Sequence, residues 1–191
     1  MRAMDLTQVG PGFSDAVATS QRVFRAGLDA LARPGRIVAL DSDAAAPRGV
    51  QPAACALLLA LLDQDTALHV STAHDAGAAA YFRFHTGCAL TDIAAQADFL
   101  LLAAHDPWPD LAALRNGGEY APDQSATLVR EVSSFSMGLA LKLSGPGIEG
   151  STALHAPELA AGFVAQWQAA RARFPRGVGV VERSSVLKVR S

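Results

Sequence analysis

The segment from Tyr81 to Gly87, YFRFHTG, places an arginine and a histidine among aromatic residues. If the segment is helical, Tyr81 and His85 lie four residues apart on one face, whereas Arg83 points away from both. The guanidinium of Arg83 is a planar donor group suited to a phosphate, a phosphonate or a partner's carboxylate. The alternative is structural: Arg83 pairs with a nearby acidic residue, and His85 stabilises the negative end of the helix dipole. Both interpretations stay open on the residues alone, and Arg36, beside a turn, is a further candidate for binding an anion or a partner.

Motifs for catalysis are missing elsewhere in the chain. The glycine-rich segment 144–152, SGPGIEGST, lacks the lysine and the spacing of a phosphate-binding P-loop. No GxGxxG motif for a dinucleotide follows a strand, and no GxSxG motif for a hydrolase nucleophile occurs. Asp63 and Asp65 lie where a helix is expected to give way to a strand, so a solvated turn explains them better than acid–base catalysis.

The histidines and lysines also give no sign of a metal site or a Schiff base. The five histidines never form HxH, HxxxH or HExxH, so a metal site would need ligands that converge from distant parts of the chain. Chemistry with pyridoxal phosphate requires a lysine. Lys142 faces away from the leucines beside it in an expected strand, and Lys188 lies close to the end of the chain. We therefore expect neither a metal nor a cofactor.

The length and composition fit one domain. The chain has 191 residues, half of them hydrophobic, which suits a single domain over 1–191 with residues 1–12 flexible. The net charge is -2 and the charged residues are scattered along the chain, which argues against a nucleic-acid surface or a basic membrane patch. Cys55 and Cys88 are far apart and predict neither a disulfide framework nor a zinc ribbon. The longest apolar run, 53–62, is about half as long as the roughly 20 residues of a membrane-spanning helix. We expect a cytoplasmic protein.

The spacing of apolar residues predicts a first helix that ends at Arg33, because the residue before a proline leaves the α region. Its apolar face consists of Phe13, Val17, Phe24, Leu28 and Leu31. Further helices are expected at 52–63, 74–86, 106–118 and 156–174.

Strands are expected between and after these helices. They lie at 36–40, 67–72, 98–103, 125–132, 138–145, 177–181 and 186–189. The strand at 36–40 is expected to be buried, and the strands at 125–132 and 138–145 are expected to pair as an antiparallel hairpin. This order of elements predicts an α/β fold with a mixed sheet covered by helices.

Five segments in series resemble the PhnH family, a subunit of the bacterial carbon–phosphorus lyase machinery. They are QRVFRAGLDALARPGRIVAL at 21–40, LLDQDTALHVST at 61–72, FRFHTGCAL at 82–90, LKLSGPGI at 141–148 and FPRGV at 174–178. The resemblance covers the chain from about residue 13 to residue 178. It implies a three-layer αβα sandwich with a mixed sheet, similar to the large domain of transferases that use pyridoxal phosphate, but without that cofactor.

The resemblance also implies a function in phosphonate metabolism. A PhnH-like chain is expected to be a non-catalytic or accessory subunit that works beside PhnG, PhnI and PhnJ. The PhnG, PhnH and PhnI assembly is associated with transfer of an alkylphosphonate onto the ribose of a purine nucleotide. The alternative is a transferase subunit that itself binds the phosphonate or the nucleotide. No catalytic residue can be carried over from the family, and whether the isolated chain has activity stays open.

The C-terminal segment 179–191 departs from the family pattern. Gly179 stands where the family usually has an acidic residue, and the chain closes with VERSSVLKVRS. This puts in doubt any contact made by the family's C-terminus. We also expect the isolated chain to form a homodimer, because a subunit built for assembly carries exposed apolar surface that self-associates when its partners are missing.

Overall fold

The computed structural model describes residues 9–74, 76–132, 138–156, 159, 162–173, 176–183 and 186–190. Within these ranges the α-helices are α1 (Ala16–Ala32), α2 (Pro52–Leu61), α3 (Ala76–Thr86) and α4 (Phe163–Arg171). The carboxylate of Asp15 caps α1 by accepting a hydrogen bond from the N–H of Ala18 at 2.9 Å. Pro52 begins α2, where its missing N–H has no intrahelical partner to lose.

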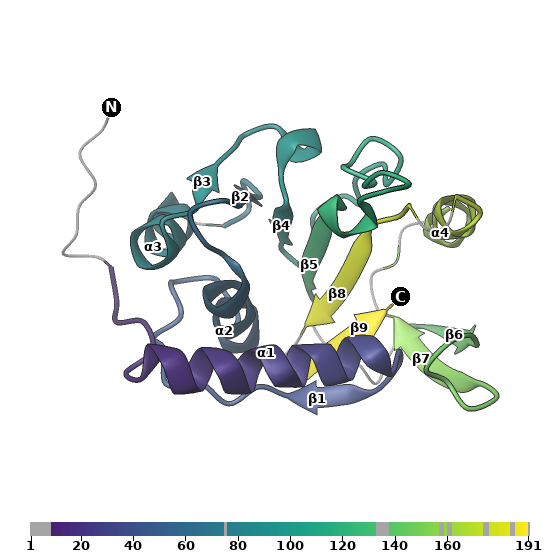
Figure 1. Cartoon of the computed structure of the whole chain (residues 1–191), viewed down its shortest axis with the longest axis horizontal. Helices are drawn as coiled ribbons and strands as arrows, with labels where there is room; N and C mark the ends of the chain where they lie inside the picture. The colour runs from purple at the N-terminus through teal and green to yellow at the C-terminus, as the bar shows by residue number, and fades with distance from the viewer. Residues whose placement is uncertain are drawn as a thin grey trace.

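A mixed sheet forms the centre of the molecule (Figure 1). Its strands are β1 (Ile37–Ala39), β2 (Ala67–Val70), β3 (Ala89–Leu90), β4 (Phe99–Leu102), β5 (Thr127–Glu131), β8 (Gly179–Arg183) and β9 (Val186–Arg190). The strand order is β1-β9-β8-β5-β4-β2-β3. The strands from β8 to β3 are parallel, whereas β9 and β1 add antiparallel at one edge. β6 (Leu139–Leu143) and β7 (Thr152–Ala156) form a separate antiparallel ribbon.

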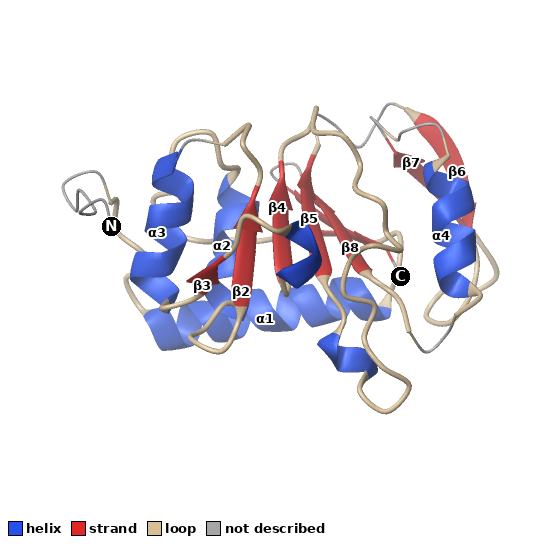
Figure 2. Ribbon diagram, turned by 90° about the horizontal axis from the view of Figure 1, so that it is seen from above, coloured by secondary structure: helices blue, strands red, loops and turns tan. Residues whose placement is uncertain are grey.

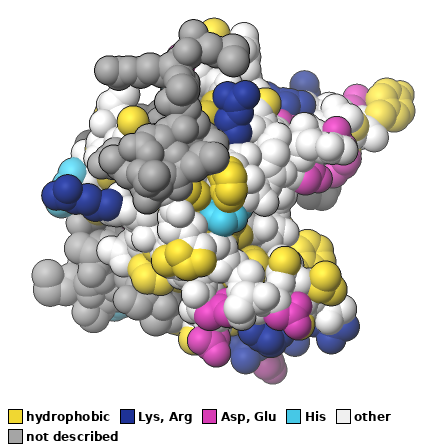
Figure 3. Space-filling view, turned by 90° about the vertical axis from the view of Figure 1, so that its left-hand side faces the viewer, with side chains coloured by type: hydrophobic (Ala, Val, Ile, Leu, Met, Phe, Trp, Pro, Cys, Tyr) yellow, Lys and Arg dark blue, Asp and Glu magenta, His cyan; other side chains and the backbone are white. Residues whose placement is uncertain are grey.

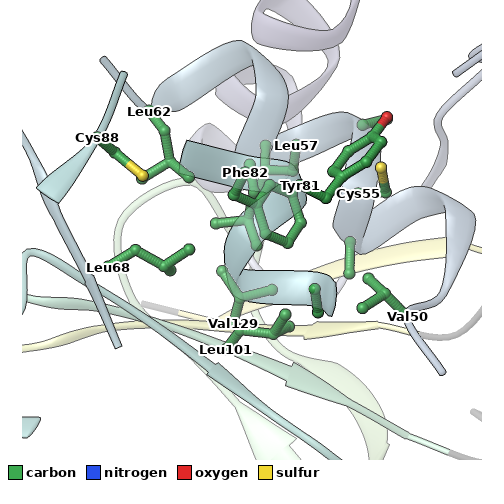
Figure 4. Close-up of a cluster of buried hydrophobic side chains, with 14 of the residues drawn as sticks. Val50, Cys55, Leu57, Leu62, Leu68, Tyr81, Phe82, Cys88, Leu101 and Val129 are labelled. Atoms are coloured by element: carbon green, nitrogen blue, oxygen red, sulfur yellow. The ribbon is translucent and has the colours of Figure 1, made fainter. Parts of the chain in front are cut away.

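Both faces of the sheet are covered. On one face, α1, α2 and α3 enclose a core that includes Leu68, Leu101 and Val129 from the sheet, with Tyr81 and Phe82 from α3 beside α2 (Figure 4). On the other face, Leu100, Leu128 and Val180 pack with Phe163 of α4 and with the connections around Leu111 and Leu114. Figure 2 shows α3 and α4 at opposite ends of the sheet, with β2, β4 and β5 between them. The expected α/β fold with a mixed sheet is confirmed.

The first helix forms as predicted but presents a different face to the core. Its buried residues are Thr19, Val23, Gly27 and Ala30. Gly27 lies against α2, where an added Cβ would stand 3.4 Å from Cδ1 of Leu57. Because small residues allow this close approach, the large apolar residues of the helix point outward. Phe13 precedes the helix and packs against the core, whereas an outer face of α1 is formed by Val17, Phe24, Leu28 and Leu31.

The hairpin expected from 125–132 and 138–145 is wrong. β5 lies inside the sheet, paired in parallel with β4 and β8. β6 pairs with β7 instead. The reason is burial: four of the five residues of β5 are buried, so the strand has no polar face for a solvated hairpin.

Two other local expectations are also wrong. Residues 106–118 form turns rather than a helix. There, Nδ2 of Asn116 donates hydrogen bonds to the carbonyl oxygens of Leu111 and Leu114, which competes with helical pairing. The strand at 36–40 is formed in part, but β1 is an edge strand on which Ile37 is exposed rather than buried.

Glycines allow the β6–β7 ribbon to contact the end of α1. Gly147 has a φ of +78° and lies so close to α1 that an added Cβ would overlap the carbonyl oxygen of Ala32. Gly35, with a φ of +88°, lies against Thr152, whose Cγ2 would be 2.8 Å from an added Cβ. The glycine-rich segment 144–152 is therefore the place where the ribbon packs against the helix.

Candidate functional site

Helix α3 positions the residues singled out from the sequence, and two of them contact the N-terminal segment. The hydroxyl of Tyr81 donates a hydrogen bond to the carbonyl oxygen of Pro11 at 3.1 Å. Nε2 of His85 lies 2.9 Å from the carbonyl oxygen of Gly10. The rings of Tyr81 and His85 are 4.5 Å apart between centroids. Tyr81 and His85 thus share a face as predicted, and their polar atoms find partners within the fold.

Burial raises the pKa of Tyr81, and the neighbouring Cys55 adds to this shift (Figure 4). A tyrosine in the unfolded chain ionises near pH 10. Above that pH the unfolded state loses a proton that the folded state keeps, so the free energy of unfolding falls by up to about 1.4 kcal/mol per pH unit. We expect Tyr81→Phe to cost about 1 kcal/mol at neutral pH through its lost hydrogen bond and to remove this alkaline decline. Denaturant unfolding between pH 7 and pH 11 measures both effects.

Tyr120 supplies the matched control for that experiment, because it is 99% exposed and is the other tyrosine of the chain. Tyr120→Phe should leave both the stability and its pH dependence at the wild-type values. If the free energy of unfolding fell with the same slope at alkaline pH in Tyr81→Phe and in the wild type, the fall could not be assigned to Tyr81.

Arg83 and Arg36 lie at different ends of the sheet. Arg83 is exposed on α3, and it forms no ion pair with any residue that the structure describes. Arg36 stands before β1, at the other edge, and its guanidinium lies 2.7 Å from the carboxylate of Asp29, which also binds Arg33. The fold therefore does not bring the three sequence candidates together. Figure 3 shows basic side chains scattered over the visible part of the α3 end rather than gathered into one patch.

One hollow among the described residues lies at the amino ends of the parallel strands. It has a volume of about 400 Å³, and its lining includes Asp65, Asp98 and Arg115. Asp98 accepts a hydrogen bond from the N–H of Ala67 at 2.8 Å and forms an ion pair with Arg115. Asp98 and Arg115 therefore pair with each other, and Asp98 also links the first residues of β2 and β4. Asp63 and Asp65 occupy the predicted turn, where the N–H of Asp65 donates to the Asp63 carboxylate at 3.0 Å.

The carboxyl ends of β2, β4 and β5 carry polar residues that the sequence analysis did not select. Ser71 and His74 follow β2, and both are buried. Arg130 and Glu131 end β5 and are buried as well. The guanidinium of Arg130 donates to the carbonyl oxygens of Ala104 and Asp106 and lies 4.6 Å from the ring centroid of Trp108. The sequence did contain a signal for these residues: in LVREV, residues 128–132, the charged pair Arg130 and Glu131 interrupts an otherwise apolar strand.

No group of three or more His, Cys, Asp or Glu residues is placed to hold a metal ion among the residues described. Within the same ranges, no helix has the length and apolar character needed to cross a membrane.

The fold and its polar edge define an α/β protein with an open, mainly parallel sheet, in which β2 and β5 end in buried polar groups. Within that class, a family model described as bacterial phosphonate metabolism protein (PhnH) matches residues 11–184. The chain belongs to the PhnH family. This confirms the resemblance found in the sequence, over nearly the same residues.

Two curated proteins are similar to the chain. The alpha-D-ribose 1-methylphosphonate 5-triphosphate synthase subunit PhnH of Rhizobium meliloti (strain 1021) is 36% identical over 170 residues, which cover 88% of this chain and 85% of that protein. The putative C-P lyase subunit protein HtxG of Stutzerimonas stutzeri is 30% identical over 164 residues, covering 84% of this chain and 76% of that protein. Both are named as subunits of larger assemblies.

Proposed function

We propose that this protein is an accessory subunit of a carbon–phosphorus lyase core complex and is required for alkylphosphonate catabolism. Membership of the PhnH family carries this proposal, and the subunit names of both relatives support it. The partners are PhnG, PhnI and PhnJ subunits, in a cytoplasmic assembly that transfers the phosphonate onto the ribose of a purine nucleotide. No cofactor is assigned to this chain.

The finer features of the fold are part of the same proposal. The chain is one domain over 1–191, and its three-layer αβα arrangement is similar to the large domain of transferases that use pyridoxal phosphate. Helices on both faces of the mixed sheet support this likeness. Of the segment 1–12 expected to be flexible, residues 1–8 lie outside the described residues, and the carbonyl oxygens of residues 10 and 11 accept hydrogen-bond contacts from α3. The strands of the divergent segment 179–191 pair with each other, so a strand pair is kept there.

We propose Arg83 as a contact to an acidic group of a partner subunit. Its guanidinium is exposed on α3, whereas Nε2 of His85 is already engaged with Gly10. His85 therefore holds the N-terminal segment against α3, on a different side of the helix from Arg83. Arg36 is a second partner or anion contact, for which an acidic group must compete with Asp29. The alternative function, direct binding of phosphonate or nucleotide, would use the same residues as anion contacts.

Co-purification tests the subunit role and the role of Arg83 together. The full chain is passed over immobilised PhnG, PhnI and PhnJ homologues of the same organism, with Arg83→Glu as the variant. We expect the wild type to be retained and the variant to bind roughly tenfold more weakly, because reversing a charge replaces an attraction by a repulsion. Arg48→Glu, another exposed arginine, is the control and should bind normally.

The outcomes of that experiment separate the claims. Failure of the wild type to bind under mild conditions would overturn the subunit role. Retention of Arg83→Glu at the wild-type level would overturn only the role of Arg83. Heat on titration with alkylphosphonates or ATP, lost in Arg83→Ala, would favour the alternative function.

We also propose that the isolated protein is a homodimer joined through the outer face of α1. The four apolar residues of this face are Val17 (83% exposed), Phe24 (44%), Leu28 (49%) and Leu31 (44%). With the exposed Gln21 they are spaced by four, three, four and three residues, which is the spacing of a helix–helix seam. A second copy running antiparallel would place Val17 near the partner copy's Leu31 and the two Phe24 rings near the two-fold axis. The seam is therefore complementary to itself, as an isologous interface requires.

A further inference from the structure

The parallel part of the sheet contains a reversal of strand order between β2 and β4. From β2 the chain passes through α3 to β3 on one side, whereas from β4 it continues to β5 on the other side. In open α/β sheets, ligands bind outside the carboxyl ends of the strands where the connections diverge in this way. The arrows of β2, β4 and β5 point to the same edge of the molecule (Figure 2). The topology therefore marks the carboxyl ends of β2 and β4 as a binding position.

Two buried polar atoms at this position have no hydrogen-bond partner among the described residues. The side chains of Ser71 and His74 belong to residues that are 9% and 8% exposed, and Oγ of Ser71 and Nε2 of His74 form no hydrogen bond with any residue that the structure describes. The two residues share one turn, in which the N–H of His74 donates to the carbonyl oxygen of Ser71 at 3.1 Å. Buried polar groups in folded proteins are nearly always hydrogen-bonded. Two unpaired groups in one turn at the diverging strands thus indicate a bound group that supplies the missing partner.

The strand register places Arg130 on the same side of the sheet as Ser71. Val70 is paired with Leu101, and Leu102 with Arg130. The N–H of Ser71 donates to the carbonyl oxygen of Leu101 at 3.0 Å, so Ser71 extends the ladder by one residue. Because alternate residues of a strand point to opposite faces, Ser71, Leu102 and Arg130 form one row on the face away from α2.

The guanidinium of Arg130 and the amino end of α3 favour a negative ligand at this position. Arg130 keeps its guanidinium in place through the carbonyl oxygens of Ala104 and Asp106. α3 begins at Ala76, two residues after His74, and directs the positive end of its dipole to this edge. Two carboxylates among the described residues near this position are held by backbone donors: Asp106 accepts from the N–H of Ala103 at 2.6 Å, and Glu131 accepts from the N–H of Gln51 at 2.6 Å.

We propose that the turn after β2 is an oxyanion-binding site, in which Ser71 and His74 contact a phosphate-like group beside the positive charge of Arg130. Oγ of Ser71 donates to one oxygen of the group, and Nε2 of His74 donates to another when its ring carries the proton there. The site is separate from the surface around Arg83 and does not depend on the proposed subunit role.

The probes are inorganic phosphate and methylphosphonate, titrated into the full-length isolated protein. Binding is followed by calorimetry and by tryptophan fluorescence, because Trp108 lies against Arg130. We expect saturable binding by the wild type and at least tenfold weaker binding by Ser71→Ala and by His74→Ala. Thr72→Ala is the matched control, because Thr72 is an exposed residue of the same turn; it should bind like the wild type.

Thermal unfolding provides a second measurement, which distinguishes ligand binding by Ser71 from a purely structural role of this residue. Without ligand, Ser71→Ala should unfold at the wild-type temperature or higher, because it removes a buried hydroxyl that has no hydrogen-bond partner in the described part of the chain. With phosphate, the wild type should gain thermal stability and Ser71→Ala should not. Absence of phosphate and methylphosphonate binding by the wild type would overturn the proposal. Equal binding by Ser71→Ala, His74→Ala and the wild type would also overturn it.

Discussion

Replacing Gly147 by alanine should destabilise the fold by about 3 kcal/mol, through a left-handed backbone that disfavours a side chain and through overpacking. Gly147 has a φ of +78°, and its Cβ would overlap the carbonyl oxygen of Ala32 at the end of α1. The obstacle is backbone, which cannot rotate aside as a side chain can. The β6–β7 ribbon would have to withdraw from α1. Urea unfolding followed by circular dichroism, at one fixed protein concentration, measures the loss.

Gly150 separates the two causes of that loss. It lies in the same connection between β6 and β7 with a φ of +70°, but nothing stands within 4 Å of an added Cβ. Gly150→Ala should therefore cost only about 1 kcal/mol, the conformational part. If Gly147→Ala and Gly150→Ala lowered the free energy of unfolding equally, the close contact with Ala32 would not contribute to the cost at Gly147.

The second large effect is expected from Leu28→Glu on the outer face of α1. In a two-fold interface each substitution occurs twice, so two carboxylates would enter the apolar seam without partners. We expect the dimer to weaken by at least about 4 kcal/mol, which is about a thousandfold in Kd. Sedimentation velocity across a range of concentrations should show a dimer for the wild type and a monomer for the variant.

Ile93→Glu is the control for the dimer, because Ile93 is 54% exposed but lies between β3 and β4, away from α1. It should remain dimeric. A wild-type protein that is monomeric at every concentration would contradict the homodimer, and a dimer that survives Leu28→Glu would place the interface elsewhere. Since Leu28 is exposed in the folded monomer, the variant should keep the wild-type circular dichroism spectrum.

Local patterns in the sequence were enough for most elements and for the family. The helix before Pro34, the alanine-rich helix that ends at Thr86 and the strand within 98–103 are all present. The five family segments lie in the right order, and the family match covers residues 11–184. These properties depend on neighbouring residues or on the order of segments, both of which can be read along a chain.

The tertiary structure decided which surfaces are buried and which residues meet. The spacing of Val17, Phe24 and Leu28 defined an apolar face on α1, but only the contact of Gly27 with α2 shows that this face is turned outward. β5 was recognisable as a strand, but its parallel partners β4 and β8 are distant in sequence.

The same distinction explains the functional sites. An α/β protein of the PhnH family could be recognised from the residues alone, and Arg83 and His85 stood out because of their unusual neighbours. Only the assembled sheet places Ser71 in one row with Arg130, because strand order and register arise from long-range pairing. Whether a polar side chain is buried without a partner likewise depends on everything packed around it. A serine and a histidine in an ordinary turn therefore carry no signal until the sheet has formed.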